Sequence, residues 1–142
     1  MDKAPPKVFK VKDPDPDDKF SDIHPHLPQP PSLLLIVGSV KQGKSNLLVN
    51  LLCNPDMYKD KFDIVKIISN TLNADPKGKL MNKYFECEDH YTDEMVTDII
   101  ESQKKYEDFE RPSIALILDD ILTKDFKKTN AVSFLATRFR HY

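Results

Sequence analysis

The sequence predicts an α/β domain whose mainly parallel sheet is flanked by helices. Three short and mostly apolar runs, at 33–37, 64–69 and 114–118, have the length and the aliphatic content of strands. A segment with helical periodicity follows each run, and strands that alternate with helices are typical of parallel sheets. The chain has 142 residues, of which 39% are hydrophobic and 31% charged, so one soluble globular domain is expected.

Proline dominates the first part of the chain. Residues 1–31 hold eight of the eleven prolines, and proline fixes φ and donates no backbone hydrogen bond. Neither a helix nor a central strand is therefore expected before residue 32. We predict an extended arm over residues 1–31, whose last part, at His24–Pro28, packs on the domain that begins at residue 32. The alternative is a disordered tail.

The first strand and the first helix are predicted on either side of a glycine loop, defined here as Gly38–Ser45. The run at 33–37 is apolar throughout and ends at a glycine, which predicts a strand buried on both faces. The following helix, over 44–52, places four leucines on one side. Asn54-Pro55 ends this helix, because the residue before a proline disfavours the helical conformation.

The rest of the chain predicts two further strands and two further helices. The second strand leads into a loop over 70–79, which contains Asp75-Pro76 and a glycine. Thr92 is the expected N-cap of a helix that runs to about Tyr106 and has acidic residues in its first turn. After the third strand, a short amphipathic helix is expected over 130–138.

The glycine loop matches G-x-x-x-x-G-K-[ST], the P-loop or Walker A pattern, at every defined position. Consecutive backbone N–H groups of such a loop surround phosphates, and the helix dipole points its positive end at the same anion. We expect Lys44 to neutralise the β- and γ-phosphates of ATP and the Ser45 hydroxyl to ligate Mg²⁺. The predicted nucleotide-binding residues are Gly38, Ser39, Val40, Lys41, Gln42, Gly43, Lys44, Ser45 and Asn46.

Two aspartates directly follow the third apolar run, which is the Walker B pattern. Two carboxylates are unfavourable at the end of a strand that is buried on both faces, unless a cation is bound there. Asp119 is expected to hold Mg²⁺ through water, and Asp120 to activate the attacking water, although aspartate is shorter than the usual glutamate. The alternative for both motifs is structural: a Gly-Lys-Ser turn, and a strand that ends in an Asp-rich turn.

Several classes of P-loop protein lack support in this sequence. A GTPase has an N-K-x-D motif, whereas Asn82-Lys83-Tyr84-Phe85 lacks the aspartate. No serine- and glycine-rich signature of an ABC ATPase occurs, and two arginines near the end are too few for the lid of a nucleotide kinase. Because the net charge is −2, the chain is not expected to bind nucleic acid through its overall charge. Its two cysteines and its lack of a long apolar run favour an intracellular protein without a membrane span.

Five stretches of the chain occur together in one known family. They are His24-Pro-His-Leu-Pro-Gln-Pro-Pro31, the glycine loop, Ile67-Ile-Ser-Asn-Thr71, the Walker B pattern and Thr137-Arg-Phe-Arg-His-Tyr142. The chain thereby resembles the poxvirus-type DNA-packaging ATPases of large cytoplasmic DNA viruses, within the FtsK–HerA superfamily of P-loop motors. The last stretch, similar to the family's Thr-Arg-x-Arg-His-Tyr, is the most specific, whereas Asn70 stands where the family often has proline.

The resemblance implies a P-loop NTPase fold and an ATP-hydrolysing motor that drives double-stranded DNA into capsids. It implies a homo-oligomeric ring, contacts with capsid proteins, and a place in the host cytoplasm at the viral factory and in the virion. It also implies that Arg138 or Arg140 acts as an arginine finger in a neighbouring subunit, which in other NTPases accelerates hydrolysis about 10³–10⁵-fold. The structural alternative is that basic residues suit the C-terminus of a helix.

In the family, a strand with a polar sensor residue follows the Arg-His-Tyr segment. This chain ends at Tyr142, so the resemblance implies the N-terminal portion of a P-loop domain, incomplete at its C-terminus and with an open sheet edge. Two other functions stay open. One is a nucleotide-binding switch or scaffold module without turnover, and the other is a phosphotransferase, for which the sequence shows neither a lid nor an acceptor pocket.

Overall fold

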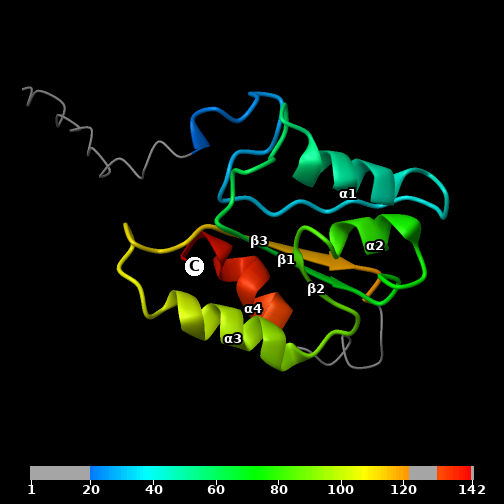
Figure 1. Ribbon diagram of the computed structural model, residues 1–142. Coiled ribbons are helices and arrows are strands. Elements are labelled where there is room, and N and C mark those ends of the chain that lie inside the picture. The colour runs from blue at the N-terminus through cyan, green and yellow to red at the C-terminus, as the bar shows by residue number, and fades with distance from the viewer. Residues whose placement is uncertain (1–19, 122–130, 142) are drawn as a thin grey trace, which may run out of the picture.

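The predicted parallel sheet is present, and three strands form it in the order β2-β1-β3 (Figure 1). These strands are β1 (Ile64–Ser69), β2 (Glu86–Glu88) and β3 (Ile114–Asp119). Both neighbours of β1 run parallel to it, and Ser69 lies opposite Asp119 in the register between β1 and β3. The carboxyl ends of β1 and β3 are therefore level with each other.

The computed structural model describes residues 20–121 and 131–141. Expectations for residues 1–19, for Asn130 as the first residue of the last helix and for Tyr142 lie outside the described residues. The helices are α1 (Lys44–Cys53), α2 (Pro76–Met81), α3 (Asp93–Gln103), α4 (Ala131–Arg138) and the short 3-10 helix η3 (Phe139–His141). In the described part of the chain, no helix combines the length and the apolar character that crossing a bilayer requires.

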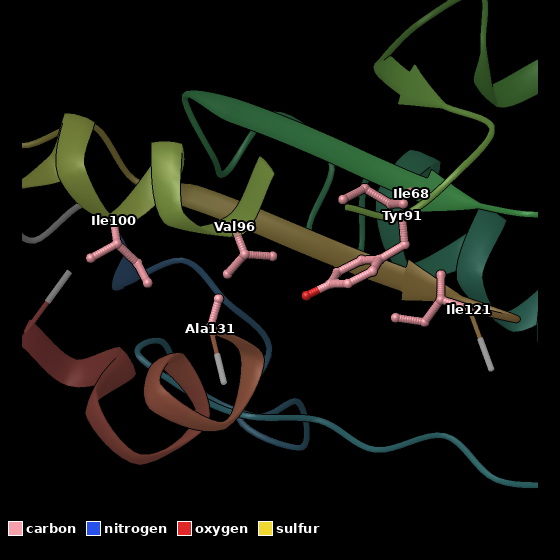
Figure 2. Close-up of a cluster of buried hydrophobic side chains, with 6 residues drawn as sticks. All are labelled: Ile68, Tyr91, Val96, Ile100, Ile121 and Ala131. Carbon is pink, nitrogen blue, oxygen red and sulfur yellow. The ribbon is translucent and has the colours of Figure 1, made fainter. Parts of the chain in front are cut away.

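Helices cover both faces of the sheet because successive side chains of a strand point to opposite faces. Ile67 and Ile68, adjacent in β1, are both fully buried but belong to different hydrophobic clusters. Ile67 packs with Leu52 of α1 and Met81 of α2. The cluster on the other face joins α3 and α4 to the sheet and contains Ile68, Tyr91, Val96, Ile100, Ile121 and Ala131 (Figure 2). The result is a three-layer α/β arrangement.

The prediction of a strand at 33–37 is wrong. The segment has no strand conformation, and the exposed fractions of Leu33, Leu35 and Val37 are 66%, 83% and 83%. An apolar run predicts burial, but a strand forms only beside another strand that accepts its hydrogen bonds. In the described residues, β3 forms the edge of the sheet on the side away from β2, and its six residues are only half-buried rather than dry on both faces.

Two short elements differ from the sequence prediction. Helix α2 occupies the end of the segment predicted as a loop, because Asp75 caps it by accepting a hydrogen bond from the N–H of Lys77 and Pro76 suits its first position. The three-residue strand β2 was not predicted, because its sequence Glu-Cys-Glu has little apolar content. Thr92 caps α3 as predicted, but the helix ends at Gln103 rather than near Tyr106.

The described part of the N-terminal arm is attached to the segment that follows α1. Ile23 is 5% exposed, and the Tyr58 hydroxyl donates a 2.6 Å hydrogen bond to the carbonyl of Pro28. The rings of Phe20 and Phe62 lie 5.7 Å apart. His24 and His26 are exposed, so the packing of His24–Pro28 depends on the Pro28 carbonyl rather than on the imidazoles.

Candidate functional site

The N-terminus of α1 is left without a side-chain cap. Its N-cap is Gly43, no side chain accepts a hydrogen bond there, and no acidic residue lies in the first turn. By contrast, α2 and α3 are capped by the side chains of Asp75 and Thr92. The first N–H groups of a helix have no partner within the helix, and the dipole makes this end positive. The end of α1 can therefore bind an anion without displacing a protein cap.

Only one of the two glycines in the glycine loop has a backbone conformation that favours glycine. Gly43 has φ 86°, in the left-handed region. A Cβ on Gly38 would meet Gln42 and Lys44 at an ordinary 3.7 Å, and its φ is not positive. Lys41 also has a positive φ of 64°, and the Gln42 N–H donates to the Ser39 carbonyl over 3.3 Å. The loop is thus a tight turn that enters α1 through Gly43.

The ammonium group of Lys44 lies within the glycine loop. Its Nζ donates hydrogen bonds to the carbonyls of Gly38 at 2.6 Å and Ser39 at 2.7 Å. The side chain therefore reaches back across the loop instead of extending into solvent. A phosphate oxygen is a stronger acceptor for this ammonium than a neutral carbonyl, so an anion at the end of α1 would compete for it.

The other predicted residues of the loop lie around the start of α1. Ser45 is half-buried in the first turn, whereas Val40 is 83% exposed at the turn of the loop. The Asn46 carbonyl accepts a hydrogen bond from the Asn50 side chain at 2.9 Å. The loop and the carboxyl ends of β1 and β3 lie on the same side of the molecule (Figure 1). In open parallel sheets, this is the side where ligands bind.

At the end of β3, Asp119 is paired with a serine that the sequence analysis did not select. The Ser69 hydroxyl donates a 2.9 Å hydrogen bond to Asp119 Oδ2 and lies 3.2 Å from the Thr71 hydroxyl oxygen. Ser69 is only 2% exposed, so its hydroxyl is fixed in place. The sequence signal for Ser69 was a polar residue at the end of an apolar strand. Its partner Asp119 is 50 residues away, and only the register between β1 and β3 brings the two side chains together.

Asp120 is exposed and has φ 50°, in the left-handed region. Aspartate is among the residues that tolerate this conformation, which turns the chain sharply after β3. The next residue, Ile121, is 5% exposed in the cluster that joins α3 and α4 to the sheet. The turn thus leaves the Asp120 carboxylate in solvent while Asp119 stays half-buried against Ser69.

The two candidate arginines lie at the opposite end of the sheet from Asp119. Arg138 ends α4, with its guanidinium 4.6 Å from the centre of the Phe134 ring, and Arg140 belongs to η3. The side chain of Arg111, which precedes the amino end of β3, donates to the carbonyl of His141 in η3. A strand rises about 3.3 Å per residue, so the six-residue β3 separates the two regions by on the order of 17 Å. The chain therefore does not bring Arg138 and Arg140 to its own Walker B aspartates, Asp119 and Asp120.

Ser45 in the glycine loop and Asp119 at the end of β3 are the kinds of donor that suit a magnesium ion shared with phosphates. Ser45 and Asp119 offer hydroxyl and carboxylate oxygens, which are the hard ligands that Mg²⁺ prefers, and such ions usually keep several waters. Among the described residues, no three His, Cys, Asp or Glu side chains form a self-sufficient metal site. Comparison with family models, with curated proteins and with solved structures gave no match.

Proposed function

We propose that the chain binds ATP with Mg²⁺ at the glycine loop and is a P-loop ATPase subunit of a motor that packages double-stranded viral DNA into capsids. The uncapped N-terminus of α1 carries the nucleotide part of this proposal. It follows a loop whose lysine is already turned inward, and it lies on the same side as the carboxyl ends of β1 and β3 (Figure 1). The motor part rests on the resemblance of the sequence.

Each residue of the proposed site has a separate task. The N–H groups at the start of α1 would bind the β-phosphate, and Lys44 would exchange its two carbonyl partners for the β- and γ-phosphate oxygens. Ser45 and Asp119 would hold Mg²⁺, which supplies charge neutralisation on the transferred phosphoryl group when bound. Asp120, exposed at the end of β3, would orient the attacking water.

In this proposal the arginines act between subunits. Arg138 and Arg140 lie about one strand length from Asp119 of the same chain, so a role in hydrolysis requires the site of a neighbour. That arrangement agrees with a homo-oligomeric ring, in which double-stranded DNA and capsid proteins are the further partners. The host cytoplasm and the virion are the corresponding locations.

A second function, a nucleotide-binding switch without turnover, is favoured by one observation. The segment 33–37, which enters the glycine loop, is not part of the sheet, so the loop lacks the strand that would hold it against Asp119. Hydrolysis needs the phosphates and the attacking water fixed within a fraction of an ångström, whereas binding at the end of α1 tolerates more movement.

Calorimetric titration of ATP, with and without Mg²⁺, tests the proposed site directly. Lys44→Ala removes a charged hydrogen-bond donor, which is worth about 1.5–3 kcal/mol, so ATP affinity should fall about 10- to 100-fold. Lys79→Ala is the matched control, because Lys79 is an exposed lysine of α2 that does not belong to the glycine loop. Equal affinities of the two variants would refute the proposed site.

Steady-state hydrolysis separates the motor from the switch. A packaging motor should hydrolyse ATP faster when duplex DNA is added, and Arg138→Ala or Arg140→Ala should lower the rate while ATP still binds. Stoichiometric ATP binding without turnover in the presence of DNA would favour the switch. Turnover that no DNA stimulates would refute packaging but leave the ATPase proposal in place.

A further inference from the structure

A polar cavity lies at the amino end of β3, away from the glycine loop. Its volume is about 390 Å³, it is open to solvent, and it is lined in part by Asp108, Arg111, Ser113, Arg140 and His141. These residues come from the segment before β3 and from η3, so the cavity forms only where the end of α4 meets the sheet. None of them belongs to the glycine loop, although Arg140 is also a candidate arginine finger for the site of a neighbouring subunit.

Arg111, which lines this cavity, is held in place by several contacts. Its side chain donates to the carbonyls of His141 and Tyr106, and its NH2 atom lies 3.0 Å from the Asp108 carboxylate. The segment that carries Arg111 is itself fixed by Gln103, which is 2% exposed and donates a 3.0 Å hydrogen bond to the Pro112 carbonyl. The guanidinium is thus positioned before any ligand arrives.

The cavity also has an excess of positive charge. Arg140 is exposed at the cavity, with no carboxylate in ion-pair contact among the described residues. Two arginines therefore face one aspartate, and Asp108 is 96% exposed, where its pairing with Arg111 is weak.

We propose that this cavity is an oxyanion site for a phosphate group, with Arg140 as the mobile ligand and Arg111 as the fixed one. Guanidinium groups match the tetrahedral oxygens of phosphate with paired N–H donors. His141 adds a polar side chain to the lining of the cavity, and the volume exceeds that of a single phosphate ion. The site is independent of the glycine loop and does not require the proposed ATPase function.

Nuclear magnetic resonance of the arginine Nε–H groups tests this site, with inorganic phosphate as the probe. The titration uses the full chain with Lys44→Ala, so that the glycine loop contributes less, and constant ionic strength, so that screening does not change. The Arg111 and Arg140 signals should shift in a saturable way. Arg140→Gln should weaken phosphate binding about tenfold, because it removes a charged donor without disturbing the contacts of Arg111.

Arg138→Gln is the matched control, because it removes the same charge two residues away, from a side chain that lies over Phe134 and does not line the cavity. Its phosphate affinity should equal that of the parent chain. The proposal is overturned if the shifts do not saturate, or if Arg138→Gln loses as much affinity as Arg140→Gln. Acetate binding as tight as phosphate binding would overturn the assignment to phosphate.

Discussion

Replacing Ser69 by alanine tests whether the hydrogen bond to Asp119 serves the proposed Mg²⁺ site. The change removes the 2.9 Å donor to Asp119 Oδ2 and leaves the strand and its burial almost intact. Without this donor the Asp119 carboxylate is free to rotate away from the orientation that the hydrogen bond gives it. Partners that orient a metal-bound carboxylate typically contribute about 10- to 100-fold to metal affinity.

The expected magnitude follows from the contact itself. A hydrogen bond to a charged group contributes about 1.5–3 kcal/mol, and the half-buried Asp119 places this one at the lower end. Since about 1.4 kcal/mol corresponds to a factor of ten, ATP affinity in the presence of Mg²⁺ should fall about tenfold. With Mg²⁺ chelated, the affinities of Ser69→Ala and the parent chain should be equal, because Ser69 contributes nothing to the glycine loop.

The matched control is Ser113→Ala, at the other end of the same pair of strands. The Ser113 hydroxyl donates a 3.0 Å hydrogen bond to Asp63 Oδ2, so this variant loses the same kind of contact between β3 and the start of β1. Isothermal titration calorimetry and urea unfolding of both variants separate binding from stability. If Ser113→Ala weakens Mg²⁺-dependent ATP binding as much as Ser69→Ala, or if Ser69→Ala acts without Mg²⁺, the reasoning is refuted.

Two further predictions concern stability. Gly78→Ala should lower the free energy of unfolding by about 1–3 kcal/mol in urea denaturation, since the new Cβ would lie 2.3 Å from the Leu72 carbonyl oxygen; unchanged stability would show that the backbone there moves freely. Tyr58→Phe should cost about 1 kcal/mol by removing the hydrogen bond to Pro28. Burial raises the pKa of Tyr58 above its ordinary value of about 10, so this contribution is present below pH 10 and is lost as the pH rises through the higher folded-state pKa. Unfolding of both forms across alkaline pH should show their difference shrinking, and a constant difference would contradict this.

Local patterns predicted most of the regular structure. The runs that became β1 and β3, and the helical periodicity of α1, α3 and α4, were recognisable because each depends on residues close in sequence. The Thr92 cap was predicted for the same reason. The left-handed Gly43 and the absence of a cap at α1 also depend on the residues of the loop itself, so the prediction that this helix end binds an anion rests on local sequence.

The tertiary structure alone decided what depends on neighbours distant in sequence. The run at 33–37 is as apolar as a buried strand, but it stays exposed because no strand lies beside it in the described sheet. Ser69 meets Asp119 only because β1 and β3 pair in one particular register, and Arg140 joins Arg111 only because η3 packs at the amino end of β3. Hydrophobic and glycine patterns report local preference, whereas strand pairing and side-chain proximity depend on which distant segments share a surface.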